Sequence, residues 1–335
     1  MKTITRDYRI TGGYPSSFTK YFADMRPCIL DIEATGLDPA KCRVCLAALL
    51  VSTESGVRIT QFLAENHYEE HLVLDAVMDF LEKEGVGYLI TYNGRAYDVP
   101  FINKRLEMNY SDRHIDLYDF DLYRFLQKGT DLKNRIGSMK QMAVEDHYGI
   151  FSDRKDTITG RESVTLFNEY SLTGNTTIEK VILTHNREDV LQLHRLMFLS
   201  LGEPEDFDAA IAACGFPAAD GRLSVRPHIS RQNKCLRICG EQLRDPFSAA
   251  VFSDADNPLT AAFSRSTASF EITVPAERLD DNYYIDIYRL GIEIQDPDCI
   301  NGYLILSPRT VNLISALITE KVLQDLSLSC TDTDH

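Results

Sequence analysis

The amino-acid sequence predicts an α/β domain followed by a small α+β domain. Segments with the patterns of strands and helices alternate along the first 200 of the 335 residues. An acidic stretch with Gly and Pro follows at residues 202–208, and expected strands outnumber helices after it. The length also suits two domains, on a prior of roughly 150 residues each. We therefore expect domains at residues 1–201 and 207–330, the second without an assigned role.

The first domain begins with three strands that we expect to form an antiparallel meander. Apolar residues alternate with acidic ones at 27–34, and residues 44–52 are almost entirely apolar. A Ser-Gly turn then leads into a strand at 57–64. A helix at 68–83 has apolar residues at helical spacing and ends at a Gly-Val-Gly sequence, after which we expect a strand at 88–92.

The rest of the first domain is expected to be mainly helical. A Pro in the first turn favours a helix at 99–108, and an alternating pattern predicts a strand at 114–120. Ser138 and Gln141 have the spacing of a capping box for the next helix. The last three helices are expected at 139–147, 162–170 and 177–199.

The second domain is expected to consist of strands and one closing helix. An amphipathic apolar stripe predicts the helix at 310–326. The strands are expected at 234–240, 268–274, 283–288 and 303–306.

The composition excludes a disordered chain and a helical membrane span. Apolar residues make up 44% of the chain and charged residues 25%, which is typical of globular proteins. The longest strictly apolar run, residues 44–51, is far shorter than the ~20 residues that a membrane helix needs. Residues 1–17 carry charges where a signal peptide has an apolar core, so we expect a cytoplasmic protein.

The net charge of −15 argues against nucleic acid only at first sight. Residues 1–200 hold 24 Lys and Arg against 29 Asp and Glu, a net charge of only −5, so most of the net negative charge lies after residue 200. Within residues 124–140, five basic residues accompany a single Asp. A nucleic-acid partner therefore remains compatible with the charge, although a solvated helix face is the favoured explanation of the basic segment itself.

Two carboxylates lie at the end of the first expected strand. Because side chains alternate along a strand, Asp31 and Glu33 share one face while Leu30 and Ile32 pack on the other. Strands disfavour Asp, and the flanking residues are too apolar for an edge in bulk water. A pair of solvated carboxylates at a strand edge is the alternative.

Three further candidates lie at the ends or on the faces of helices. Asp98 is placed where a strand and turn lead into a helix, and capping alone would explain it. His185 and Asp189 are four residues apart and share one face of the last helix of the first domain, as an ordinary surface pair would.

Taken together, the four acids predict a metal site. Asp31, Glu33, Asp98 and Asp189 come from a strand end, a helix start and a long helix, as a convergent site in an α/β fold requires. Without cations they would repel one another and raise each other's pKa values. Two Mg²⁺ or Mn²⁺ ions would resolve this and would suit phosphodiester hydrolysis. His185 is then placed to take a proton from the attacking water.

Three stretches resemble the exonuclease motifs of the DEDD superfamily, and more narrowly its bacterial YprB-like branch. They occur in the order of the motifs, with fitting strand and helix contexts, and the resemblance covers about residues 25–200. It implies a ribonuclease H-like mixed sheet flanked by helices, and residues 205–335 have no comparable match. The stretches are DIEATGL (31–37), YNGRAYDVPFI (92–102) and HNREDV (185–190).

The resemblance implies that Asp31, Glu33, Asp98 and Asp189 bind the metal ions and that His185 is the general base. One departure concerns the base. The histidine form of the superfamily usually has four residues between His and Asp, and the tyrosine form has three. This chain combines a histidine with the spacing of the tyrosine form.

Five residues inside the motifs are candidates for substrate binding. By the resemblance, Thr35 and Leu37 would meet the terminal nucleotide and Asn93 would support the second motif. Plain turns at Thr35-Gly36 and Asn93-Gly94, the latter of type I′, are the alternatives. Arg95 and Arg187 are candidates for contact with substrate phosphates.

The sequence therefore predicts a metal-dependent nuclease that hydrolyses phosphodiester bonds by a two-metal-ion mechanism. The resemblance adds the mode: a 3′-5′ exonuclease acting on the 3′ end of single-stranded DNA or RNA. Two alternatives remain open at this point. One is a binding module for nucleic acid or protein that keeps the fold without catalysis, and the other is a structure-specific endonuclease.

The eight cysteines indicate reduced thiols rather than a disulfide framework. Cys42 and Cys45 have zinc-like spacing but no second pair. A looser set with one histidine has irregular spacings, so buried core residues are the favoured interpretation of both. The looser set consists of Cys214, His228, Cys235 and Cys239.

Overall fold

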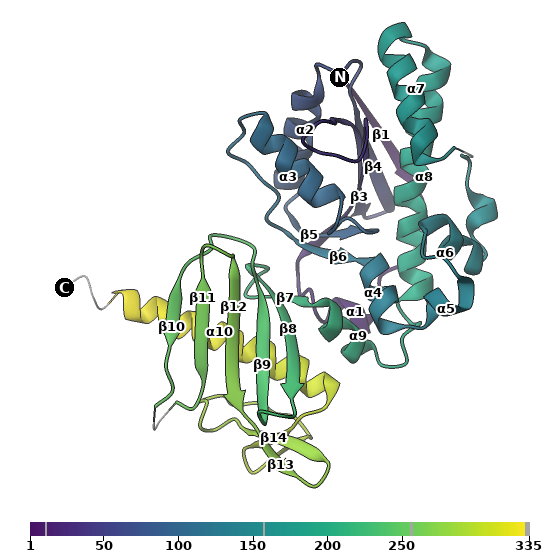
Figure 1. Cartoon of the computed structure of the whole chain (residues 1–335). Coiled ribbons are helices and arrows are strands. Elements are labelled where there is room, and N and C mark those ends of the chain that lie inside the picture. Colours follow the sequence, from purple (N-terminus) through teal and green to yellow (C-terminus); the bar gives the residue numbers. More distant parts are fainter. Residues whose placement is uncertain (11, 157, 255–256, 332–335) are drawn as a thin grey trace. The chain divides into compact units, whose positions relative to one another are not determined.

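The structure is a computed structural model that describes residues 1–10, 12–156, 158–254 and 257–331. The chain forms two compact units, Met1–Glu205 and Asp206–His335, each with its own sheets and core (Figure 1). Among the described residues, no helix has the length and apolar character needed to cross a membrane.

Unit 1 is built on a mixed sheet of six strands in the order β1-β4-β3-β2-β5-β6. The pairs β1–β4, β4–β3 and β3–β2 are antiparallel, whereas the pairs β2–β5 and β5–β6 are parallel. The predicted mixed sheet flanked by helices is confirmed, including the meander of β2, β3 and β4. The strands are β1 (Lys2–Tyr8), β2 (Arg26–Ala34), β3 (Val44–Thr53), β4 (Gly56–Leu63), β5 (Val86–Thr91) and β6 (Tyr118–Asp121).

Helices cover both faces of this sheet. The pair α2 and α3 lies on one side and the long helix α8 on the other (Figure 1). The four larger helices are α2 (Glu70–Lys83), α3 (Asp98–Met108), α7 (Gly160–Thr173) and α8 (Thr176–Ser200). The smaller ones are α1 (Ser16–Thr19), α4 (Leu122–Gly129), α5 (Leu132–Ile136), α6 (Gln141–His147) and the 3₁₀ turn η1 (Phe151–Asp153).

The core of unit 1 joins the sheet to its helices. Leu46 and Leu49 of β3 are fully buried and belong to the same apolar cluster as Val73 of α2 and Ile182 of α8. Burying each such side chain contributes about 1.5–3 kcal/mol. The strands that carry the predicted acids are therefore held between two packed layers.

A buried ion pair fastens α2 to α3 and to β3. Glu70, 4% exposed, accepts hydrogen bonds from Arg105 Nε at 2.8 Å and Nη2 at 2.6 Å. It also accepts the backbone N–H of Val44 at 2.8 Å. Because both charges are buried and hydrogen-bonded, removing one of them alone costs about 3–5 kcal/mol.

Two local predictions for unit 1 differ from the structure, and one strand was not predicted. The strand predicted at 114–120 begins only at Tyr118, because Asn103 holds both backbone groups of Ile115 through its side-chain amide. The predicted capping box at Ser138 is wrong, since Lys140 is the N-cap of α6 and makes no side-chain cap. β1 was not predicted, because its largely polar sequence has no apolar stripe.

Unit 2 has a six-stranded antiparallel sheet, a smaller four-stranded sheet and a long C-terminal helix. The sheets have the orders β10-β11-β12-β9-β8-β7 and β13-β14-β16-β15. Ile238 and Ile272 of the larger sheet and Ile314 of α10 are fully buried, and α10 packs on β8 and β9. The predicted small α+β character is confirmed.

The elements of unit 2 were partly predicted. The four predicted strands correspond to β9, β12, β14 and β16, whereas α9 and the remaining strands were missed. The helices are α9 (Phe207–Cys214) and α10 (Pro308–Thr331). The strands are β7 (Phe216–Ala218), β8 (Leu223–Ser230), β9 (Cys235–Gln242), β10 (Ala249–Val251), β11 (Thr260–Ser264), β12 (Ser269–Pro275), β13 (Glu277–Leu279), β14 (Asn282–Asp286), β15 (Cys299–Ile300) and β16 (Tyr303–Ile305).

Candidate metal centre and cleft

A cleft of about 900 Å³ lies in unit 1, at the end of β2. Its walls come from β2, the turn before α3, α6, the first turns of α7, and α8. All four acids predicted from the sequence line it, together with His185. The structure thus brings together residues that are up to 158 positions apart in the sequence. The four acids are Asp31, Glu33, Asp98 and Asp189.

The strand β2 presents its two acids toward α8. The side chain of Asn186 donates to Asp31 Oδ2 at 2.8 Å, and His185 Nε2 lies 3.4 Å from Glu33 Oε1. Leu30 and Ile32 are buried on the opposite side, as the alternation predicted. The interpretation of Asp31 and Glu33 as a solvated edge pair is wrong, because Glu33 is only 8% exposed.

Asp98 is the first residue of α3, but it does not cap the helix. Tyr97 occupies the N-cap position, and Asp98 Oδ1 instead accepts the backbone N–H of Ile32 at 3.0 Å. This bond ties the start of α3 to the strand that carries Asp31 and Glu33. The interpretation of Asp98 as a helix cap is therefore wrong, because its side chain contacts the backbone of β2 within the cleft.

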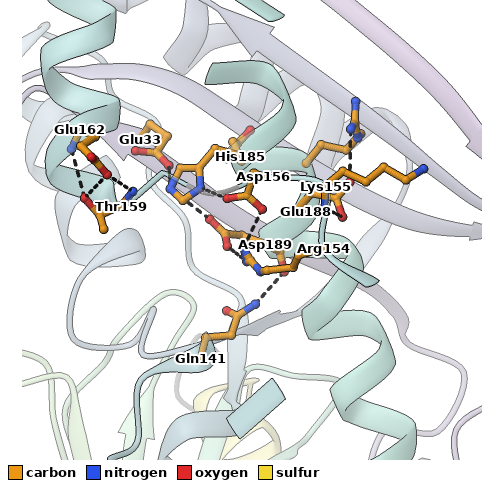
Figure 2. Close-up of polar contacts among 12 residues, drawn as sticks. Glu33, Gln141, Arg154, Lys155, Asp156, Thr159, Glu162, His185, Glu188 and Asp189 are labelled. Atoms are coloured by element: carbon orange, nitrogen blue, oxygen red, sulfur yellow. Dashed lines mark hydrogen bonds and ion pairs between the residues drawn. The ribbon is translucent and has the colours of Figure 1, made fainter. Parts of the chain in front are cut away.

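His185 and Asp189 project from one face of α8 into a set of polar contacts (Figure 2). His185 Nδ1 lies 2.6 Å from Asp156 Oδ2, and Nε2 lies 3.7 Å from Asp189 Oδ2. Arg154 forms an ion pair with Asp189 and also contacts Asp156 Oδ1 at 3.1 Å. Its Nε contacts Glu145 Oε2 at 2.8 Å. The interpretation of His185 and Asp189 as a surface pair is wrong.

All four acids have pKa values above those of free carboxylates. Burial is the main cause in each case, and the neighbouring carboxylates add to it. Burial and Asp189 raise the pKa of Asp31 well above its ordinary value. Burial raises the pKa of Glu33 to about 7, against the opposing effect of His185. The pKa of Asp98 is likewise raised to about 7, and that of Asp189 is raised.

The donor set of the cleft fits a divalent cation. One ligand atom each from Glu33, His185 and Asp189 lies within 4.8 Å of the others. Asp31 and Asp98 each have one carboxylate oxygen held by a protein donor, so that each can bind a cation through its other oxygen. A bound cation would favour the ionised form of these carboxylates and would offset the repulsion between them.

The predicted substrate-binding residues divide into two groups. Leu37, which is 83% exposed, and Asn93 line the cleft. Thr35, Arg95 and Arg187 are not among its lining residues. Thr35 Oγ1 accepts the backbone N–H of Arg43 at 2.9 Å, as in a structural turn. Arg187 is 7% exposed and its Nη2 lies 3.2 Å from Glu188 Oε1, which leaves it without access to substrate.

Several residues of the site were missed by the sequence reasoning. Lys140, Arg161 and Tyr97 line the cleft, and Arg154 and Asp156 stand directly behind its acids. Arg154 and Asp156 belong to no recognisable motif, because their partners on α8 lie 35 and 29 residues further along the chain, respectively. Lys140 belongs to the basic segment that was noted but interpreted as a solvated face.

The cysteine sets do not form metal clusters in the part of the chain that the structure describes. The group of potential metal ligands found there contains no cysteine. Cys45, Cys214 and Cys235 are buried, in line with the core interpretation. Cys330 lies outside the described side chains.

The fold and the cleft define an α/β protein with an acidic candidate metal site at the end of a central strand. A sequence model of the RNase H superfamily matches residues 28–200, about half of the chain. The chain therefore belongs to the RNase H superfamily. This membership supports nucleic-acid hydrolysis as the class of activity.

Comparison with solved structures includes a family B DNA polymerase from the hyperthermophilic archaeon Pyrobaculum calidifontis. The identity is 16%, the TM-score is 0.42, and the match covers 70% of this chain. It covers 33% of the polymerase chain, so this chain spans only a part of that protein. No curated protein matches the sequence.

Proposed function

We propose that the chain is a metal-dependent nuclease, and more specifically a 3′-5′ exonuclease acting on single-stranded DNA or RNA. The convergence of four mutually repelling carboxylates in one cleft carries this proposal. Membership of the RNase H superfamily supports phosphodiester hydrolysis. The resemblance of three motifs to those of DEDD exonucleases supports the 3′-5′ direction. We also propose that the protein acts in the cytoplasm.

The acids would hold two Mg²⁺ or Mn²⁺ ions. Such ions lower the pKa of an attacking water and stabilise the negative charge on the leaving oxygen. Asp31 is oriented by Asn186, and Asp98 by the backbone of Ile32, so both carboxylates are fixed before substrate binds. By the resemblance, His185 would take the proton from the water.

The remaining walls of the cleft suit a single strand of nucleic acid. Lys140 and Arg161 place positive charge beside the acids, where substrate phosphates would lie. Tyr92, Tyr97 and Leu37 offer flat or apolar surfaces for unpaired bases. With a net charge of −15 over the whole chain, we expect weak, salt-sensitive binding that depends on the cleft and its cations.

A digest of end-labelled substrates tests the proposal. Single-stranded DNA and RNA of one sequence are labelled at either the 5′ or the 3′ end and incubated with Mg²⁺ or Mn²⁺. A 3′-5′ exonuclease gives a ladder from the 5′ label and immediate release of a labelled mononucleotide from the 3′ label. Asp98→Asn and EDTA both abolish cleavage, whereas Asp75→Asn, a matched change on the exposed face of α2, retains it.

Three other results of this digest would each lead to a different conclusion. Cleavage at internal positions of both labelled substrates identifies an endonuclease. Undiminished cleavage by Asp98→Asn refutes the assignment of the site. Binding without cleavage of any substrate supports a non-catalytic module.

A further inference from the structure

The turn between β5 and α3 brings Asp98 into the cleft, and side chains of two strands hold its first residues. Thr91 is the last residue of β5, and Asp121 lies opposite it on β6, which runs parallel to β5. Asp119 shares the face of Asp121, because side chains alternate along a strand. Thr91, Asp119 and Asp121 are 0%, 6% and 4% exposed. None of these three side chains lines the cleft, so they meet the site only through the turn.

Two consecutive N–H groups of the turn donate to these side chains. The N–H of Asn93 donates to Asp121 Oδ1 at 2.8 Å, and the N–H of Gly94 donates to Thr91 Oγ1 at 3.1 Å. The hydroxyl of Thr91 in turn donates to Asp119, at 2.8 Å from Oδ1 and 3.0 Å from Oδ2. Because the hydroxyl both accepts and donates, it connects the turn to β6.

The same turn fixes the backbone on both sides of Asp98. The carbonyl oxygen of Gly94 accepts the N–H of Tyr97 at 3.2 Å and the N–H of Val99 at 3.1 Å. The N-cap residue of α3 makes no side-chain hydrogen bond, so these backbone bonds hold the start of the helix. The hydroxyl of Thr91 therefore acts on Asp98 through Gly94.

These contacts tie Asp98 to the sheet that carries the acids of β2. β2 pairs with β5 and β5 pairs with β6, while Asp98 Oδ1 accepts the N–H of Ile32 in β2. A cap within α3 would hold the helix alone, whereas bonds to the sheet fix the position of Asp98 relative to Asp31 and Glu33. The groups of a functional site have to be held to within about 0.5 Å, and hydrogen bonds behind the ligands supply this precision.

We infer that Thr91, oriented by Asp119, is a positioning residue that sets the carboxylate of Asp98 for cation binding. Asp121 supports the same turn through the backbone of Asn93. The inference rests on the metal site of the proposed function and adds residues that contact neither the cation nor the substrate. Loss of the hydroxyl should therefore change the affinity for the cation without removing a ligand.

Titration of the full-length protein with Mn²⁺, followed by EPR, tests this inference without a nuclease assay. The signal of free Mn²⁺ gives the dissociation constant. Thr91→Val keeps the shape of the side chain and the charge of the site, and we expect it to weaken Mn²⁺ binding about tenfold. Thr91→Ser retains the hydroxyl and should bind as the wild type does. Thr60→Val, the same change at a buried threonine of β4 that does not line the cleft, should leave the affinity unchanged.

A merely structural role of Thr91 predicts a different result. It would lower the melting temperature of Thr91→Val and leave the Mn²⁺ affinity of the folded protein unchanged. Circular dichroism confirms that each variant is folded under the conditions of the titration. Thr91→Ala takes the place of Thr91→Val if the added methyl group beside the N–H of Gly94 prevents folding.

The same titration in an Asp98→Asn background identifies the acid through which Thr91 acts. Three acids of the cleft remain in this background, so we expect weaker Mn²⁺ binding, and adding Thr91→Val should not weaken it further. Independent effects would add, so a further loss of about tenfold in the double variant would overturn the assignment to Asp98.

The results that overturn the inference differ from those that overturn the proposed function. Wild-type affinity in folded Thr91→Val, or equal losses in Thr91→Val and Thr60→Val, overturns the positioning role and leaves the proposed nuclease intact. A Thr91→Ser variant as weak as Thr91→Val does the same. A wild-type protein that binds neither Mn²⁺ nor Mg²⁺ overturns both the inference and the proposed function.

Discussion

Replacing Asp98 by Asn should stabilise the metal-free protein while it abolishes the proposed activity. Asp98 is 6% exposed, and its Oδ1 accepts the backbone N–H of Ile32. Asn has the same shape and keeps an acceptor oxygen for that bond. What it removes is a buried negative charge beside other carboxylates.

The size of the effect follows from the pKa of Asp98. Burial, with Asp121 and Asp189 nearby, raises it from 3.8 to about 7. At about 1.4 kcal/mol per pH unit, the charged form costs the folded protein about 4 kcal/mol. Burying the new amide offsets about 1–3 kcal/mol of the gain. We expect the variant to be more stable by about 2 kcal/mol at pH 8 in EDTA.

The pH dependence has a definite sign. Since the folded pKa lies above the unfolded value of 3.8, the folded protein takes up a proton and its stability falls as the pH rises through 7. Asn does not titrate, so the difference between variant and wild type is smallest at pH 4 and grows until about pH 7. Added Mn²⁺ reverses the order, because the wild type binds it more tightly.

Differential scanning calorimetry at pH 4, 6 and 8 measures these differences. At about 2–4 °C per kcal/mol for a unit of this size, the transition of unit 1 should rise by about 4–8 °C at pH 8. Asp75→Asn controls for the loss of an exposed charge and should shift the transition by less than about 0.5 kcal/mol. A folded Asp98→Asn variant that melts below the wild type in EDTA at pH 8 would refute the reasoning.

Three further predictions concern unit 1. Burial lowers the pKa of His194 from 6.5 to about 4, so stability should fall by up to about 3 kcal/mol as the pH drops from 6.5 to 4. Urea unfolding of His194→Gln at several pH values should show that this loss of stability between pH 6.5 and 4 is absent. A variant with the same dependence of stability on pH as the wild type would contradict the prediction. Glu70→Gln should cost about 3–5 kcal/mol in urea unfolding by leaving Arg105 with an unpaired buried charge, whereas Glu107→Gln, at an exposed pair, should cost under about 1 kcal/mol. Gly94→Ala would place a methyl group 2.4 Å from Thr91 Cβ, so we expect a lower melting temperature, and an unchanged one would show that the turn adapts.

Much of unit 1 was predictable because its pattern is local. The alternation of Leu30 and Ile32 with two acids identified both the strand β2 and the face that carries its carboxylates. The apolar run of β3 and the helical spacing in α2 and α8 were equally direct. β6 shows the limit of such patterns, since the side chain of Asn103 withdraws Ile115 from the strand in a way that no alternation records.

The candidate site was predictable only as far as its motifs reached. The four acids and His185 each have a recognisable local context, and the structure places them in one cleft. Arg154 and Asp156 have none, because their importance depends on tertiary contacts with α8. Arg95 and Arg187 were expected to contact phosphates only because they lie inside the motifs. The position of a residue in a motif does not determine the direction of its side chain.

The burial of Arg154 has a consequence for loop exchange and protein engineering. Connecting segments usually tolerate insertions and replacement, since they lie on the surface and contribute little to the core. The segment between η1 and α7 differs, because Arg154 contacts Glu145, Asp156 and Asp189 with a side chain only 1% exposed. Grafting or shortening this segment would therefore alter the cleft as directly as a substitution of its acids, and a redesigned loop has to retain both Arg154 and Asp156.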